Sequence, residues 1–417
     1  MQNAHVKSEK FVRNYQMTSK AFVFIDGLED KPIVCGVVTL DTQKKHGEFR
    51  YGKSYLLRDD AFALDPLNLP LNSNLFTTTN QKGVFGVLAD AGADSWGKKV
   101  ILSLHNTKPN DPIEFLLAGA GMGVGSLVFS LSSKSSKSKI NKNTLGDIPM
   151  LLKAKDAILN DEEIPKEAQK AFEYGSSMGG ARPKTTVSDA DITYLAKFNR
   201  PDDLFNHAKV EHASMRMLNE LTCRVAKTKV VETDNGDVLL VERFDLVDAR
   251  PSHHFISANS LINLSSVNSS SLIERYSYGF LAEFLLKYSS VPEDAPELFY
   301  RMVFNVLIGN TDDHTRNHAF LYSFKNKDWR LSPAYDVLPI NANNQHGMGI
   351  GLDGRNGTID NLLSQSERFA LKRFKAEKII KEVLDLVYQW PYYFKNHGVG
   401  DGDIERLKGI IPAHLHV

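Results

Sequence analysis

The residues best suited to chemistry lie in one short segment, GNTDDHTRN (309–317). Asp312 and Asn317 have the spacing D-x-x-x-x-N, in which the aspartate accepts the proton of a hydroxyl nucleophile and the asparagine oxygen binds Mg²⁺. Both side chains offer the hard oxygen atoms that magnesium and phosphate chemistry requires. Asp313 has a different offset to Asn317, so Asp312 is the preferred base. The segment follows an apolar helical pattern, and it is therefore predicted to be a catalytic loop held by a rigid helix.

Two further side chains occur at the intervals expected around such a loop in a protein kinase. Asp336 ends the strand-like segment WRLSPAYDV (329–337), where a kinase carries a metal-binding aspartate. Lys197 lies within ITYLAKFN (192–199), on the opposite face from the apolar residues, and resembles the strand lysine that pairs with nucleotide phosphates. The predicted cofactors are therefore ATP and Mg²⁺, with Asn317 and Asp336 as the metal ligands.

Two other segments are predicted to surround the nucleotide. The glycine-rich turn GSSMGG (175–180) precedes Lys197 by about the interval of a loop that covers phosphates. The segment VLLVERF (238–244) follows a hairpin and ends the β-rich part, where a hinge strand would offer backbone groups to adenine. His314 is expected to pack or hydrogen-bond so that it holds the catalytic loop beside the nucleotide. The further residues assigned to the nucleotide site are Ser177, Gly179, Gly180, Glu242 and Phe244.

Each of these side chains also has a structural explanation. Asp312 could cap a helix, Asp336 could form a turn, and Lys197 could lie on a solvated strand face. The order of the elements favours catalysis, because it is the order found in a kinase. Along the chain this order is a glycine-rich loop, a strand lysine, a helix, a hairpin, further helices, the D-x-x-x-x-N motif and a strand aspartate. Zinc binding by His314 and His318, spaced i, i+4, is a further alternative, but the pair lacks the glutamate that H-E-x-x-H supplies as general base.

The composition is that of an average globular protein. The chain has 417 residues, of which 42% are hydrophobic and 24% charged, and this excludes disorder as the main state, a collagen-like fibre and a disulfide scaffold. Its 50 Lys and Arg residues balance its 50 Asp and Glu residues, so DNA or an anionic membrane is not expected to bind the surface as a whole. Cys35 and Cys223 are too few for a cysteine-based zinc site. Without a secretory signal or a long apolar stretch, the protein is expected to be cytoplasmic.

Four parts of the chain differ in pattern. They are predicted to be an N-terminal subdomain (1–131), a linker (132–146), a kinase N-terminal lobe (147–250) and a C-terminal lobe (251–417). The first part is β-rich, and its expected strands include AFVFI, PIVCGVVTL and SYLL within residues 21–57. The second contains SSKSSKSKINKN (132–143), which fits a solvated linker better than a nucleic-acid contact because it lacks interleaved aromatic residues.

Periodicity places the motifs on elements of the two lobes. A helix is expected at about 209–226, and the Asn-Gly pair at 235–236 predicts a hairpin. Beyond about residue 250 the hydrophobic period changes from two to 3.6. Residues 271–274 match a helix capping box, and Gly309 stands where a helix C-cap belongs. The expected fold is α+β: a two-lobed protein-kinase-like fold with an extra N-terminal subdomain, a β-rich N-terminal part and an all-helical C-terminal lobe.

On these motifs the chain resembles the HipA family of bacterial serine/threonine kinases, the toxin halves of type II toxin–antitoxin systems. The segments that carry the resemblance are SSMGGARPK (176–184), YLAKF (194–198), VERFDL (241–246), NVLIGNTDDHTRNHAFLY (305–322) and LSPAYDVLP (331–339). In the first third, DSWGKKVI (94–101) and LLAGAGMGVGSLVF (116–129) are similar to the N-terminal subdomain of the family. The segment 94–101 departs from the usual P-D-G-W-G-R, and its helix is expected to lie away from the nucleotide.

The resemblance implies a role for each candidate residue. Asp312 is implied to be the base, Asn317 and Asp336 the Mg²⁺ ligands, and Lys197 the phosphate-binding lysine. It also implies autophosphorylation of a serine before G-A-x-x-K, which switches off nucleotide binding. Several positions remain open at this point: Ser177 or Ser176 as the modified serine, Glu211 or Glu220 as the partner of Lys197, and Arg182 and Lys184 as phosphate-binding or solvated residues.

The resemblance implies a function as well. It implies an ATP- and Mg²⁺-dependent serine/threonine protein kinase whose substrate is a translation-related protein of the aminoacyl-tRNA synthetase class. It implies a partner of the HipB type, a small helix-turn-helix antitoxin, through which DNA is contacted indirectly, and no membrane. A small-molecule phosphotransferase on the same framework, and a non-catalytic co-repressor bound to a DNA-binding antitoxin, are the alternatives.

Overall fold

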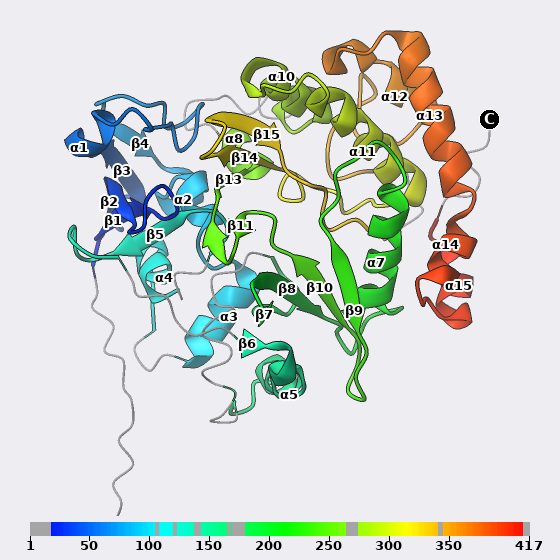
Figure 1. Cartoon of the computed structure of the whole chain (residues 1–417), viewed down its shortest axis with the longest axis horizontal. Helices are drawn as coiled ribbons and strands as arrows, with labels where there is room; N and C mark the ends of the chain where they lie inside the picture. The colour runs from blue at the N-terminus through cyan, green and yellow to red at the C-terminus, as the bar shows by residue number, and fades with distance from the viewer. Residues whose placement is uncertain are drawn as a thin grey trace, which may run out of the picture.

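The computed structural model describes residues 18–104, 108–119, 123–136, 143–164, 168, 180–263, 274–340 and 345–411. Among the described residues, three sheets of three or more strands succeed one another along the chain, a two-stranded sheet lies between the second and the third in sequence, and helices cover the third (Figure 1). In this view the helices α10 to α15 extend from the top centre down the right side, with the first sheet on the left and the second below the centre. Among the described residues, no helix has the length and apolar character needed to cross a membrane.

The first sheet has five antiparallel strands in the order β4-β3-β2-β1-β5. Its strands are β1 (Lys20–Ile25), β2 (Ile33–Asp41), β3 (His46–Tyr51), β4 (Phe76–Thr78) and β5 (Leu127–Ser130). The short helices of this part are α1 (Lys53–Leu56), η1 (Asn80–Lys82), α2 (Gly86–Asp90), α3 (Ser95–Leu104) and α4 (Pro112–Ala118). The expected strand SYLL is wrong, because α1 occupies it. This helical turn buries Tyr55, and the Tyr55 hydroxyl donates to the Phe62 carbonyl at 2.9 Å.

The second sheet carries Lys197. Its strands, in the order β6-β7-β8-β10-β9, are β6 (Asn143–Thr144), β7 (Lys184–Asp189), β8 (Ile192–Phe198), β9 (Thr228–Val231) and β10 (Val238–Glu242). The elements around them are η2 (Leu145–Asp147), α5 (Ile148–Leu159) and α7 (His207–Leu218). Ala196 and Leu240 pack in one core with α5, whereas Leu239, on the opposite face, packs in the core that contains α7. The predicted hairpin is confirmed: β9 pairs with β10, and Gly236 has a φ of 117°.

The C-terminal part is mainly helical, but the expectation of an all-helical lobe is wrong. The hairpin strands β11 (Leu246–Val247) and β12 (Arg250–Pro251) lead into a three-stranded antiparallel sheet of β13 (His253–Ser257), β14 (Ala319–Ser323) and β15 (Asp328–Leu331). Every residue of β14 is buried. A strand that is apolar on both faces has no period of two, so its sequence resembles a buried helical segment.

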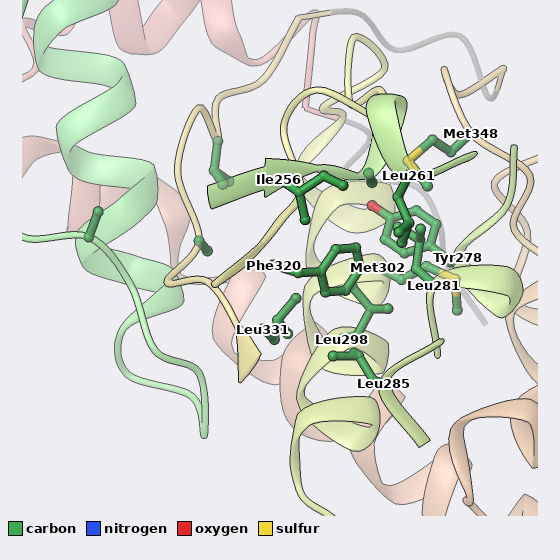
Figure 2. Packing of buried hydrophobic residues seen from close by; sticks show 14 of the residues in the cluster. Ile256, Leu261, Tyr278, Leu281, Leu285, Leu298, Met302, Phe320, Leu331 and Met348 are labelled. Atoms are coloured by element: carbon green, nitrogen blue, oxygen red, sulfur yellow. The ribbon is translucent and has the colours of Figure 1, made fainter. Parts of the chain in front are cut away.

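Three helices of the C-terminal part, α8 (Ala258–Ile262), α10 (Tyr278–Tyr288) and α11 (Asp294–Ile308), pack on this third sheet. The later helices pack mainly on other helices, and they are α12 (Ile359–Leu363), η3 (Ser366–Phe369), α13 (Arg373–Val387), α14 (Trp390–Asn396) and α15 (Asp401–Leu407). Figure 2 shows Leu281 of α10, Leu298 of α11 and Phe320 of β14 in one apolar cluster. The predicted cap is confirmed, because Gly309 ends α11 with a φ of 77°. The predicted capping box includes Ser271, which lies outside the described residues, and Ser277 caps α10.

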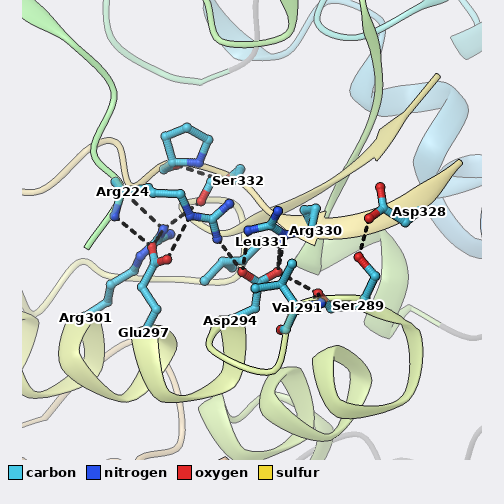
Figure 3. Close-up of polar contacts among 12 residues, drawn as sticks. Arg224, Ser289, Val291, Asp294, Glu297, Arg301, Asp328, Arg330, Leu331 and Ser332 are labelled. Carbon is cyan, nitrogen blue, oxygen red and sulfur yellow. Dashed lines mark hydrogen bonds and ion pairs between the residues drawn. The ribbon is translucent and has the colours of Figure 1, made fainter. Parts of the chain in front are cut away.

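A buried polar network joins α11 to the strand that leads towards Asp336 (Figure 3). Arg301 is 2% exposed, forms an ion pair with Glu297 one turn earlier, and donates to the Ser332 carbonyl at 2.7 Å. The carbonyl of Arg224, which follows α7, accepts a hydrogen bond from Arg301 at 3.1 Å, and Arg224 Nε donates one to Glu297 at 2.9 Å. The segment after α7 and the segment after β15 are therefore fixed to the same helix.

Asp294, at the start of α11, completes this network. Its carboxylate accepts the backbone N–H of Leu331 at 2.9 Å and forms ion pairs with Arg224 at 2.6 Å and Arg330 at 3.1 Å. Burial raises the pKa of Asp294, but hydrogen bonds from Arg330 and Leu331 and the charge of Arg224 outweigh it and hold the pKa below its ordinary value. The carboxylate therefore stays ionised, and its negative charge fixes the end of β15.

Removal of one member of this network should destabilise the fold. In Arg301→Met the side chain keeps a similar volume, but the buried carboxylate of Glu297 loses one of its positively charged partners. We therefore expect the free energy of unfolding to fall by about 3 kcal/mol. The measurement is chemical denaturation of the full chain. The control is Arg373→Met, which breaks the exposed Arg373–Glu377 pair and should change stability by less than about 0.5 kcal/mol. Equal stabilities of the two variants would contradict the assigned role of Arg301.

Candidate active site

Lys197 is held between two carboxylates from different parts of the chain. Its Nζ lies 2.6 Å from Glu211 Oε1 on α7 and 2.6 Å from Asp336 Oδ1 after β15. The structure thus brings together Lys197 and Asp336, which are 139 residues apart, as the sequence motifs require. It also selects between the two candidate glutamates, because Glu211 points inward from α7 and pairs with the lysine, whereas Glu220 follows the end of the helix.

Lys197 and Asp336 stabilise each other in the charged form, whereas burial raises the pKa of Glu211 above its ordinary value in spite of Lys197. Burial alone would lower the pKa of Lys197, but Asp336 and Glu211 raise it above its ordinary value. Burial would raise the pKa of Asp336, but Lys197 and then Lys184 hold it well below its usual range. Asp336 also has a φ of 60°, a conformation that a residue with a side chain rarely adopts. Such strain is found where the surrounding structure fixes a functional side chain.

Lys184 is a second lysine at the same site. It lies opposite Lys197 in the register of β7 and β8 and is 8% exposed. Burial, followed by the nearby charge of Lys197, lowers the pKa of Lys184 to about 8. A Cβ atom at Gly180 would meet the Lys184 ammonium, which would then have to move, and Gly180 has a φ of 101° that favours glycine. Lys184 therefore offers a buried positive charge at the end of the glycine-rich loop.

The catalytic-loop candidate has one exposed and one buried aspartate. Asp312 is exposed, and its carbonyl accepts a long hydrogen bond from Asn317 Nδ2 at 3.5 Å. Asp313 is 2% exposed and accepts hydrogen bonds from the Tyr278 hydroxyl and, at 3.0 Å, from His318 Nε2. Asp313 thus anchors the loop and leaves Asp312 facing solvent. Tyr278 and His318 hold this loop through Asp313, and His314 Nδ1 is buried without a hydrogen-bond partner among the described residues.

The segment that carries Asp336 lies beside this loop. The Tyr335 hydroxyl donates to the Arg316 carbonyl at 2.9 Å, next to Asn317, and the charge of His314 is among those that lower the pKa of Asp336. The side-chain nitrogen of Asn317 faces the Asp312 carbonyl, so the side-chain oxygen of Asn317 is available as a metal ligand. An ionised carboxylate and an amide oxygen fit Mg²⁺, which takes few protein ligands and completes its shell with phosphate and water.

The remaining candidates stand as follows. Ser176, Ser177 and Gly179 lie outside the described residues. The N–H of Glu242 donates to the Lys227 carbonyl at 2.8 Å, so that donor is already used. The ring of Phe244 lies 5.8 Å from that of Tyr335, which precedes Asp336. Arg182 forms an ion pair with Asp203, and its side chain is 30% exposed. Among the described residues, no group of three His, Cys, Asp or Glu side chains is arranged to hold a metal, and His318 is engaged with Asp313.

The helix that the sequence predicts to lie away from the nucleotide, α3, contacts the end of the glycine-rich loop and the catalytic-loop candidate. At the start of α3, Asp94 accepts the N–H of Gly180 at 3.2 Å and an ion pair from Arg316 at 2.5 Å. Trp96 donates its indole N–H to the Lys184 carbonyl at 2.9 Å. Sequence reasoning missed these residues because their partners are more than 80 positions away. The tryptophan and aspartate of the DSW motif were the available signal.

Comparisons with known proteins agree with this geometry. A protein of Haemophilus influenzae named "Putative kinase" is 27% identical over 199 residues, which are 43% of this chain and 56% of that protein, so the chain spans little more than half of this relative's length. The structure of HipA from Shewanella oneidensis, solved in a toxin–antitoxin complex with HipB and operator DNA, superimposes with a TM-score of 0.62 at 16% identity. The match covers 92% of this chain and 93% of that one.

A family model matches more than half of the chain. It is described as the HipA-like C-terminal domain and covers residues 176–390, from the glycine-rich loop to the end of α13 and the start of α14. The matched region contains Lys197, Glu211, Asp312, Asn317 and Asp336. The chain therefore belongs to the family of proteins with a HipA-like C-terminal domain.

Proposed function

We propose that the chain is an ATP- and Mg²⁺-dependent serine/threonine protein kinase. The observation that carries the proposal is the Lys197–Glu211–Asp336 triad, with both distances at 2.6 Å, beside a loop that presents Asp312 and Asn317. Lys197 and Lys184 would bind the nucleotide phosphates, and Asp312 would orient the hydroxyl of the substrate and accept its proton. Asn317 and Asp336 would hold Mg²⁺, which when bound neutralises the developing charge on the phosphates.

We also propose the finer features of this function. The substrate is a translation-related protein of the aminoacyl-tRNA synthetase class, and the kinase is the toxin of a toxin–antitoxin pair. Support comes from the family to which the chain belongs and from a structural neighbour solved with HipB and operator DNA. The partner would be a small helix-turn-helix protein of the HipB type, and DNA would be contacted through it, which agrees with the even balance of acidic and basic residues.

The assignment of the base can be tested with Asp312→Asn. The amide cannot accept the proton of the nucleophile, so we expect the rate of phosphoryl transfer to fall by about a thousandfold. The affinity for Mg·ATP should change little, because the Lys197 triad does not include Asp312. The measurements are transfer of labelled phosphate and calorimetric titration with Mg·ATP. Asp385→Asn, an exposed aspartate on α13, is the matched control, and equal activity of the two variants would refute the assignment.

The affinity for Mg·ATP should depend on pH through Lys184. Because burial and Lys197 lower its pKa to about 8, this lysine is charged below that pH and loses its charge above it. We therefore expect the dissociation constant of Mg·ATP to rise by up to about tenfold per pH unit above pH 8. Titrations from about pH 7 to about pH 9 measure this. Lys184→Met should bind more weakly and without this dependence, so the same slope in both proteins would contradict the role of Lys184.

Autophosphorylation is a further expected outcome. Incubation of the full chain with Mg·ATP should add one phosphoryl group in the loop that contains Ser177, and peptide mass spectrometry locates it. The added negative charge would repel the nucleotide phosphates, so the modified protein should bind Mg·ATP more weakly. Ser177→Ala should remain unmodified, whereas continued modification at the neighbouring position would assign the site to Ser176. An active protein without any modified serine in this loop would exclude autoregulation at this position.

A further inference from the structure

The end of the glycine-rich loop is attached to α3 of the N-terminal subdomain. The backbone N–H of Trp96 donates to the Gly180 carbonyl at 3.2 Å, and the indole N–H donates to the Lys184 carbonyl at 2.9 Å. Asp94 accepts the N–H of Gly180 at 3.2 Å. Three hydrogen bonds therefore fix residues 180–184, and with them the backbone of Lys184, to an element outside the region matched by the family model.

The same carboxylate oxygen of Asp94 reaches the catalytic loop. Arg316 Nη1 donates to Asp94 Oδ2 at 2.5 Å, and Oδ2 is also the atom that accepts from Gly180. Arg316 directly precedes Asn317, and its carbonyl accepts from Tyr335 at 2.9 Å. Burial would raise the pKa of Asp94, but the charge of Arg316 outweighs it and lowers the pKa. Asp94 is therefore an ionised group shared by two loops that face the same nucleotide site.

Other contacts attach the subdomain independently of Asp94. Asp90 of α2 accepts from the N–H and the hydroxyl of Ser257, both at 2.8 Å. Asp245, in the segment after β10, accepts the N–H of Gly125 at 2.7 Å. Because these bonds and the apolar core of the first sheet remain when Asp94 is removed, its substitution should leave the subdomain in place and change only the link between the two loops.

We propose that Asp94 is a positioning residue that sets the separation of the glycine-rich loop and the catalytic loop, and with it the position of the nucleotide phosphates relative to Asn317. This inference rests on the function proposed above. A single charged acceptor shared by two donors holds both segments at fixed distances, which positions the reacting groups before the nucleotide arrives. Because Lys184 packs against Gly180, a displacement of Gly180 would also move the Lys184 ammonium.

The test uses the full chain and two measurements. The first is the slow hydrolysis of ATP, which needs no protein substrate. We expect Asp94→Ala to raise the KM for Mg·ATP by about fivefold, with a thermal midpoint close to that of the wild type. Asp94→Asn, which keeps an acceptor for Gly180 but loses the charge opposite Arg316, should have an intermediate KM. Arg316→Ala should also raise KM, and the double variant should be no worse than the more severe single variant, because both act on one contact.

The second measurement is hydrogen exchange of the protein without nucleotide. Exchange in the peptide that spans residues 180–184 should be faster in Asp94→Ala, while exchange in α5 stays unchanged. Lys99→Ala is the matched control, because Lys99 also lies on α3 and pairs with Asp161 at 3.1 Å, away from both loops. Its KM and its exchange at 180–184 should equal those of the wild type.

The outcomes separate this inference from the function on which it rests. A wild-type protein that neither binds nor hydrolyses Mg·ATP refutes the proposed function, and the positioning role falls with it. A wild-type protein that hydrolyses ATP, with an unchanged KM and unchanged exchange in Asp94→Ala, overturns the positioning role alone. A lowered thermal midpoint with an unchanged KM likewise overturns it, because Asp94 would then serve stability only.

Discussion

The site depends on the pairing of one buried ammonium with two carboxylates. Lys197 lies on a strand of the second sheet, Glu211 on the helix that packs against that sheet, and Asp336 in the C-terminal part. Charges in such a position are expensive to desolvate, and pairing offsets this cost without adding much net stability. The triad therefore fixes geometry more than it stabilises the fold. Its two ion pairs join α7 and the Asp336 segment to β8 of the second sheet.

The segment that carries Asp336 is held from its other side as well. The carbonyls of Arg224 and Ser332 both accept from Arg301, and Ala334 exchanges backbone hydrogen bonds with Arg224 and Ala226. Arg224 follows α7, whose first turns supply Glu211, so the helix and the Asp336 segment are linked at two places. The strained φ of Asp336 is tolerated because these contacts leave its backbone no alternative position. Under the proposed function this rigidity would serve catalysis, since most of the rate of phosphoryl transfer comes from positioning and charge.

Local sequence patterns were sufficient to predict the elements whose hydrophobic residues repeat with a single period. The alternation of 192–198 places Lys197 opposite the apolar face, the Asn-Gly hairpin occurs, and Gly309 ends α11. The third sheet was missed because β14 is buried on both faces and has no alternation. The order of motifs predicted that Lys197 and Asp336 would meet, but it could not select between Glu211 and Glu220. That choice depends on where α7 ends, which tertiary packing decides.

The contacts of Asp94 show why sequence separation limits such prediction. Its carboxylate binds Gly180 and Arg316, which lie 86 and 222 residues further along the chain. No sequence periodicity connects residues so far apart. The match to the C-terminal family domain begins at residue 176, yet the described end of the glycine-rich loop makes its hydrogen bonds to α3, which lies before that boundary. A loop that covers phosphates has few apolar contacts of its own, so its position depends on whatever element its backbone can bond to. Here that element is α3, so the candidate site depends on contacts from α3 as well as from β8, α7 and the Asp336 segment.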